Sequence, residues 1–155
     1  MTEKIPAKRV DVVSLKMIKE TSVLYSHQGN RKVDSPSQVL TLVNDFLAES
    51  DREKFLVICL NTKNEPTHIS VVSVGTLNAS IVHPREIYKL AFLANSNQII
   101  LCHNHPSGDT TPSQEDLQVT KRMVEAGNIL GVSVLDHVIV GGDSCYTSFK
   151  EKNLI

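Results

Sequence analysis

The sequence lacks several features that define whole classes of protein. None of its 155 residues is tryptophan and only three are cysteine. Cys59, Cys102 and Cys145 stand singly in apolar or mixed runs, unlike a disulfide framework or a CxxC zinc knuckle, so we expect buried free thiols. No stretch approaches the roughly 20 apolar residues of a membrane span, and MTEKIPAKRVDVV at the start lacks the apolar block of a secretory signal. These absences predict a soluble, cytoplasmic protein with no membrane partner.

A surplus of charge of one sign is also missing. The chain has 16 Lys and Arg against 17 Asp and Glu, a formal net charge of -1 and a pI near 6.6. Phosphate backbones and anionic lipids are attracted by a positive field, which such a chain does not provide. We therefore expect no strong nucleic-acid binding. The 41% hydrophobic content is enough for the core of one domain.

Some segments have apolar residues at helical spacing and others are apolar runs typical of strands. Together they predict an α/β fold with a central mixed β-sheet flanked by helices. Helices are expected to begin at Ser35-Pro36, His83-Pro84 and Thr111-Pro112, where a capping residue or proline precedes an apolar stripe. Gly127 is expected to help end the third helix. Apolar runs predict a hairpin of central strands over residues 54–61 and 67–75, then strands over 98–105, in VSVLDHVIVG and around SCYTSF.

The first 34 residues differ from the rest. Residues 10–26 carry partial alternation and β-branched side chains, which favour one or two edge strands. No repeat or low-complexity linker follows them. We therefore expect one domain over residues 35–155 and an N-terminal extension, residues 1–34, whose edge strands belong to the same domain.

The segment QIILCHNHPSGDTTPSQED carries the clearest chemical pattern. His103 and His105 are two residues apart at the end of an apolar strand, so both imidazoles point to one side and Asn104 to the other. The turn that follows brings Ser113 and Asp116, on one face of the next helix, back over the strand end. Catalytic zinc takes three such ligands and leaves a fourth position for water.

Each part of this pattern also has an ordinary interpretation. Two histidines can be surface residues, and Ser-x-x-Asp at a helix start can be only a capping box. Because the parts are adjacent and joined by a Gly/Pro turn, we favour a zinc site with the ligands His103, His105 and Asp116. A metal-activated water also benefits from a carboxylate that takes its proton, for which Glu53 and Glu86 are both candidates.

At HNHPSGDTTPSQED the chain resembles the RadC-like branch of the JAMM/MPN (JAB) zinc metalloprotease superfamily. GTLNASIVHPRE and LDHVIVGG resemble the same pattern, and the likeness runs from about residue 35 to residue 155. The resemblance implies a JAB/MPN-like domain with one Zn²⁺ per chain on His103, His105 and Asp116, and Ser113 as the hydroxyl that stabilises the tetrahedral intermediate. In JAMM enzymes the catalytic Glu precedes the first core strand, which matches Glu53 and leaves Glu86 as the alternative.

The resemblance predicts a zinc-dependent peptidase or isopeptidase that acts on a peptide or protein conjugate. Longer RadC proteins carry a helix-hairpin-helix module, for which the first 34 residues are too short and too strand-like. Ubiquitin-cutting JAMM isopeptidases use insertions for which this chain has little room. The alternative is a DNA-repair-associated or mobile-element module with a structural or vestigial metal.

Two further residues bear on the site. Hydrolysis of a phosphoester or small amide at the same metal stays open, and a second metal could use Asp109, although a Gly-Asp turn is more often an Asx turn. His137 lies in an apolar strand and needs a hydrogen-bond partner, for which Asp136 lies on the wrong face. A core histidine is the ordinary interpretation, and the likeness at LDH also allows a supporting role behind the ligands.

Overall fold

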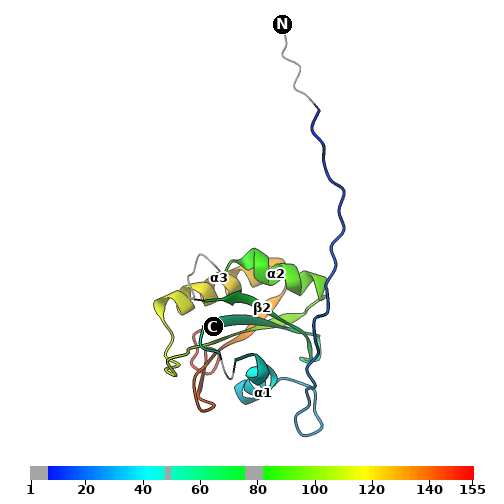
Figure 1. Ribbon diagram of the computed structural model, residues 1–155. Helices are drawn as coiled ribbons and strands as arrows, with labels where there is room; N and C mark the ends of the chain where they lie inside the picture. Colours follow the sequence, from blue (N-terminus) through cyan, green and yellow to red (C-terminus); the bar gives the residue numbers. More distant parts are fainter. Residues whose placement is uncertain (1–6, 48–49, 76–81) are drawn as a thin grey trace.

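The computed structural model describes residues 7–47, 50–75 and 82–155 (Figure 1). Residues 76–81 of the GTLNASIVHPRE motif lie outside these ranges. The helices are α1 (Pro36–Leu47), α2 (Pro84–Leu93) and α3 (Gln114–Leu130). The strands are β1 (Lys54–Leu60), β2 (Pro66–Val74), β3 (Gln98–Asn104), β4 (Ser133–Val140) and β5 (Tyr146–Ser148).

The strands form one mixed sheet in the order β2-β1-β3-β4-β5. β3 and β4 are parallel, and α3 connects them; the other neighbouring pairs are antiparallel. The predicted single α/β domain with a mixed sheet is confirmed. One detail was wrong, because β2 lies at an edge of the sheet and only β1 of the hairpin is an inner strand.

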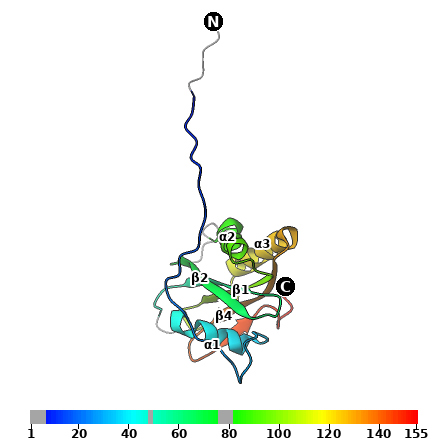
Figure 2. The same cartoon turned by 90° about the vertical axis from the view of Figure 1, so that its right-hand side faces the viewer.

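Helices cover both faces of the sheet (Figures 1 and 2). α2 and α3 lie on one face and α1 lies on the other. Successive side chains of β1 point to opposite faces of the sheet. Phe55 and Val57 pack with α2 and α3, whereas Leu56 and Ile58 pack with α1. Because both faces are buried, β1 has an uninterrupted apolar sequence.

The N-terminal segment does not contain the predicted edge strands. Residues 7–26 form no strand, and the start of this segment projects away from the sheet (Figures 1 and 2); the following turn contains a single isolated bridge between His27 and Asn30. The end of this segment does contact the domain, since Val23 and Tyr25 pack against the core on the α1 side, and further along the chain Val33 N donates to Asn64 O at 2.9 Å. The apolar alternation over residues 10–26 had no partner strand to pair with, and alternation alone does not supply one.

The helix starts follow the predicted capping chemistry, with one shift. Gln38 Oε1 of α1 accepts from Asp34 N and Ser35 N at 2.6 and 3.2 Å. His83 caps α2, and its ring accepts from the backbone of the first turn. α3, however, begins at Gln114 and not at Thr111-Pro112, because Ser113 is its N-cap.

Gly127 lies within α3, which ends later at the left-handed Gly131, so the prediction that Gly127 ends this helix was wrong. An added Cβ at Gly127 would lie 2.5 Å from both Tyr88 Oη and Val132 O. The Tyr88 hydroxyl is fixed there, since it donates to Met123 O at 2.7 Å. The glycine therefore allows α2 and α3 to approach closely.

Two expectations based on absences have mixed outcomes. All three cysteines are free and Cys59 and Cys102 are buried, but Cys145 is exposed. The expectation of buried thiols is therefore wrong for Cys145, which lies in the turn before β5 and not inside a strand. Among the described helices, none has both the length and the apolar character needed to cross a bilayer.

Candidate metal centre

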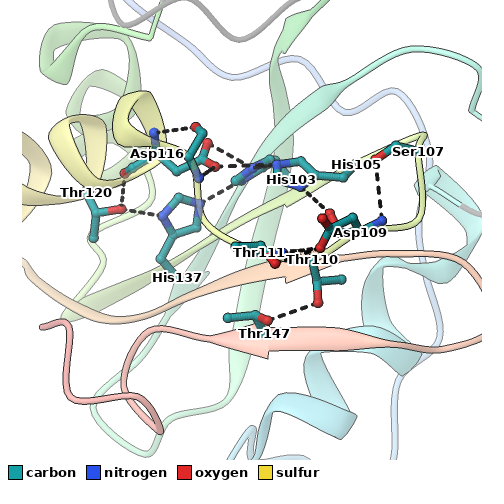
Figure 3. Close-up of polar contacts among 11 residues, drawn as sticks. His103, His105, Ser107, Asp109, Thr110, Thr111, Asp116, Thr120, His137 and Thr147 are labelled. Carbon is teal, nitrogen blue, oxygen red and sulfur yellow. Dashed lines mark hydrogen bonds and ion pairs between the residues drawn. The ribbon is translucent and has the colours of Figure 1, made fainter.

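The predicted ligands come from the end of β3 and the start of α3. His103 is in β3, and His105 follows it with its N–H bonded to Val140 O at 2.8 Å, which continues the β3–β4 ladder by one residue. Gly108, with a φ of 86°, closes the turn after the strand, and Gly108 N donates to His105 O at 2.9 Å. This short turn returns the chain so that the first turn of α3 faces the two imidazoles (Figure 3).

Two imidazole nitrogens and one carboxylate converge there. His103 Nε2 lies 3.0 Å from His105 Nε2 and 3.2 Å from Asp116 Oδ1, and His105 Nε2 lies 3.4 Å from Asp116 Oδ2. Tetrahedral zinc at about 2.0–2.1 Å from each ligand requires ligand atoms about 3.3–3.4 Å apart. The three residues are therefore spaced to hold one such ion with little movement.

A capping box fixes the carboxylate. Ser113 Oγ accepts from Asp116 N at 3.1 Å, and Ser113 N donates to Asp116 Oδ2 at 2.7 Å. Both bonds are local consequences of Ser-x-x-Asp at a helix start. The ordinary interpretation and the functional one are thus compatible, because the cap orients the proposed ligand.

A buried hydrogen-bond chain behind His103 determines which of its nitrogens can bind a metal. The Thr120 hydroxyl donates to Asp116 O at 2.6 Å and lies 2.5 Å from His137 Nδ1, and His137 Nε2 lies 2.8 Å from His103 Nδ1 (Figure 3). Because the only proton of the hydroxyl is used, His137 Nδ1 must donate to Thr120 and His137 Nε2 must accept from His103 Nδ1. His103 Nε2 then carries the lone pair that faces Asp116 and His105.

The surroundings of His137 agree with this neutral form. Burial, followed by the neighbouring His103, holds the pKa of His137 well below its usual value. Its ring is enclosed between Phe149, with ring centroids 4.6 Å apart, and Phe55, at 5.5 Å. Asp136 is not its side-chain partner, as expected, and accepts instead from His137 N, Ser148 Oγ and Lys150 N.

The second histidine is oriented in the same way by the turn. His105 Nδ1 lies 2.7 Å from the carbonyl oxygen of Asp109, an acceptor, so Nδ1 carries the proton and Nε2 faces the site. The Asp109 carboxylate accepts from Thr111 N and Oγ1 at 2.9 and 2.7 Å. Asp109 therefore forms the Asx turn that was the ordinary interpretation, and it contributes its backbone oxygen to the orientation of His105.

The charges favour a cation. Burial by itself would raise the pKa of Asp116, but the neighbouring imidazoles of His103 and His105 lower it far below its usual range, so the carboxylate is anionic. The hydrogen bond with Asp116 is the main cause that raises the pKa of His105, and burial opposes it. Without metal, a proton on His105 is therefore stabilised at the place in which a cation would bind.

The two candidate glutamates lie in different surroundings. Phe55 pairs with His103 in the antiparallel β1–β3 ladder, so Glu53, two residues earlier, lies at the same end and on the same face as the ligands. Glu53 is half-buried, and its charge contributes to the raised pKa of His105. Glu86 is exposed in the first turn of α2, where it pairs with Lys89 at 3.2 Å.

An open groove runs along α1, on the face of the sheet opposite α3, and His105 is the one proposed ligand that lines it; His103 and Asp116 do not. It has a volume of about 680 Å³. Its walls contain His105 and Asn104, one side of α1, and the 140–146 segment. Of the described residues that line it, none is lysine or arginine, and Asp143 is the one acidic residue.

Sequence reasoning missed three residues that support the site. It left His137 unassigned and gave Thr120 and Asn104 no role at the site. The HxH spacing does indicate that Asn104 points away from the ligands, and its amide bonds to the backbone on both sides of Glu53. No local pattern identifies the partners of Thr120 and His137, since they lie in different elements.

Comparison with known proteins identifies the family. The RadC-like JAB domain matches residues 33–154. A UPF0758 protein of Methanosarcina barkeri is 48% identical over 131 residues, which cover 84% of this chain and 57% of that protein. UPF0758 proteins of Caldanaerobacter subterraneus and Desulforamulus reducens are 53% and 52% identical, over 84% and 77% of this chain and 56% and 52% of theirs. The chain thus spans little more than half the length of these relatives, and it belongs to the RadC-like JAB domain family.

Proposed function

We propose that this protein is a zinc-dependent peptidase or isopeptidase, and that residues 35–155 form its catalytic domain. The observation that carries the proposal is the convergence of His103 Nε2, His105 Nε2 and an Asp116 carboxylate at 3.0–3.4 Å from one another. Two neutral imidazoles and one carboxylate form the three-ligand set of a catalytic zinc site, in which a fourth position is left for water.

The residues around the ligands divide the remaining tasks. A zinc ion held there would polarise the scissile carbonyl and lower the pKa of the attacking water. Glu53 takes a proton from this water as its oxygen adds to the carbonyl carbon, and delivers the proton to the leaving nitrogen as the C–N bond breaks. The Ser113 hydroxyl accepts from Asp116 N at 3.1 Å, which leaves its own proton to donate to the developing oxyanion.

The groove beside His105 favours a peptide over a nucleic acid. It is lined mainly by hydroxyl, amide and apolar groups, together with His105 and Asp143 and, among the described residues, by no lysine or arginine. Nucleic acids are held mainly by cationic contacts to phosphates, so a wall without lysine or arginine and with the acidic Asp143 gives such a substrate little affinity. A DNA-associated module with a vestigial metal therefore has less support than a peptidase.

The proposal is tested with three preparations in the same cell extract. Zinc-loaded protein, chelator-stripped protein and zinc-loaded Glu53→Gln are incubated separately, and new protein N-termini and released conjugates are identified by mass spectrometry. We expect products only with the zinc-loaded wild type. Equal products from wild type and Glu53→Gln would contradict the assignment of Glu53, and products from the stripped protein would contradict metal catalysis.

Metal analysis of ligand variants tests the site independently of any substrate. Purified wild type should contain about one zinc per chain, since three ligands match one tetrahedral ion. His103→Ala and Asp116→Ala should lose it. Full metal occupancy in either variant would show that the ion binds elsewhere. Tight DNA binding by the wild type at physiological salt would instead support the alternative function.

A further inference from the structure

Asn104 lies between the two histidine ligands in sequence, but its side chain belongs to a different contact. It is 5% exposed. Its Oδ1 accepts from Lys54 N at 2.7 Å, and its Nδ2 donates to Arg52 O at 3.0 Å. The amide orientation is unambiguous, because a backbone N–H can only donate and a carbonyl can only accept.

These two bonds bracket one residue. The Arg52 carbonyl belongs to the peptide group before Glu53, and the Lys54 N–H belongs to the peptide group after it. The Glu53 carbonyl is held separately, since Gly75 N donates to it at 2.8 Å. The backbone torsions of Glu53 are therefore fixed from the strands on both sides of it.

The bonds also replace the regular sheet pairing at this point. The β1–β3 ladder has its last pair at Phe55 and His103. Beyond that pair, the side chain of Asn104 contacts the backbone of the opposite strand and carries the alignment on to Glu53. The ladder alone fixes the register of β1 but would leave the residue before Lys54 at a frayed strand end.

We propose that Asn104 is a positioning residue that holds the Glu53 carboxylate at the metal centre. The inference rests on the proposed function, because it requires Glu53 to act beside the metal. One strand then supplies two ligands through His103 and His105 and aligns the general base through the residue between them. The distance between base and ligands is thereby fixed within a single strand pair.

Asn61 provides a matched control at the other end of β1. Like Asn104, it makes two bonds to the backbone, since its Oδ1 accepts from the N–H groups of Lys63 and Glu65 at 2.9 and 3.0 Å. Asn61→Ala therefore removes two side-chain bonds to the backbone in the turn that follows β1, away from the proposed ligands. A purely structural role for Asn104 predicts that Asn104→Ala and Asn61→Ala behave alike at the metal centre.

The test uses the Co²⁺-loaded full chain at one pH, because the visible absorption of Co²⁺ reports the groups around it. Glu53→Gln should alter the spectrum while cobalt affinity stays near that of the wild type. Asn104→Ala should cause the same alteration, the double variant should add nothing further, and Asn61→Ala should match the wild type. If Asn104→Ala does not fold, Asn104→Thr takes its place in each comparison.

The outcomes separate the two proposals. A wild-type spectrum in Asn104→Ala or Asn104→Thr, alongside an altered one in Glu53→Gln, would overturn the positioning role and leave Glu53 as the base. An unaltered spectrum in Glu53→Gln would contradict both the role of Glu53 as the base and the positioning role of Asn104. Once a substrate is known, Asn104→Ala should lower kcat by about 10²-fold with little change in KM, since a displacement of about 1 Å costs that much.

Discussion

Thr120→Val tests the hydrogen-bond chain that prepares His103 for metal binding. The substitution keeps the shape of the side chain and removes its hydroxyl, which donates to Asp116 O at 2.6 Å and lies 2.5 Å from His137 Nδ1. His137 is fully buried, so its Nδ1 proton would lose its only acceptor. The ring can then move this proton to Nε2 and donate to His103, which forces the His103 proton onto the nitrogen that faces the metal.

The expected loss of zinc affinity follows from the tautomer change that zinc binding would have to reverse. Binding would require the tautomers to return, leaving a buried N–H without a partner at a cost of about 1–3 kcal/mol. Loss of a partner behind a metal ligand typically weakens binding by about 10–100-fold, or roughly 1.4–2.7 kcal/mol. The two ranges agree, so we expect zinc affinity to fall by about one to two orders of magnitude.

The assay is a competition titration against a chelator of known affinity, with thermal unfolding of the metal-free protein as a check on folding. Thr41→Val is the matched control, since its hydroxyl also donates to the carbonyl four residues earlier, at 3.2 Å, but it is exposed. Its zinc affinity should equal that of the wild type. If folded Thr120→Val also binds zinc like the wild type, the tautomer argument would be refuted.

Three other perturbations have defined outcomes. Zinc affinity should fall as the pH is lowered through the raised pKa of His105, because the protonated ring cannot bind zinc. The fall should begin above the usual histidine pKa of about 6.5. Zinc titrations between about pH 8 and 5.5 measure it, and an affinity that does not change with pH would contradict the prediction. Glu53→Gln should keep zinc and lose about 10²–10⁴-fold in hydrolysis, whereas Glu86→Gln should change it little; the opposite ranking would transfer the role. Gly127→Ala should destabilise the fold by about 1–3 kcal/mol in denaturant unfolding, because its Cβ would lie 2.5 Å from two oxygens, and unchanged stability would show that the helices can separate there.

The sequence was most informative where partners are close along the chain. Ser-x-x-Asp forms its capping box within one helical turn, and HxH gives two imidazoles on one side of a strand end. Because the turn between them is short, the start of the helix must lie close to the two histidines. These relations depend on local geometry, so they could be predicted before any packing was known.

Interpretations that needed a partner elsewhere were open or wrong. The alternation over residues 10–26 predicted strands, but strand formation also requires a neighbour with free backbone groups, and the described residues 7–26 have no such pairing. Gly127 was expected to end a helix, whereas close contact with Tyr88 of another helix explains it. Composition cannot distinguish a glycine needed for its torsions from one needed for its small size.

The sequence by itself therefore determined the candidate ligand set, His103, His105 and Asp116, and the class of chemistry that such residues would allow. Tertiary structure decided which other groups reach them. The β1–β3 register places Glu53 beside His105 and leaves Glu86 exposed on α2, and the packing of α3 on β4 joins Thr120 to His137. Register and packing are set by interactions summed over whole strands and helices, so no single motif within the chain encodes them.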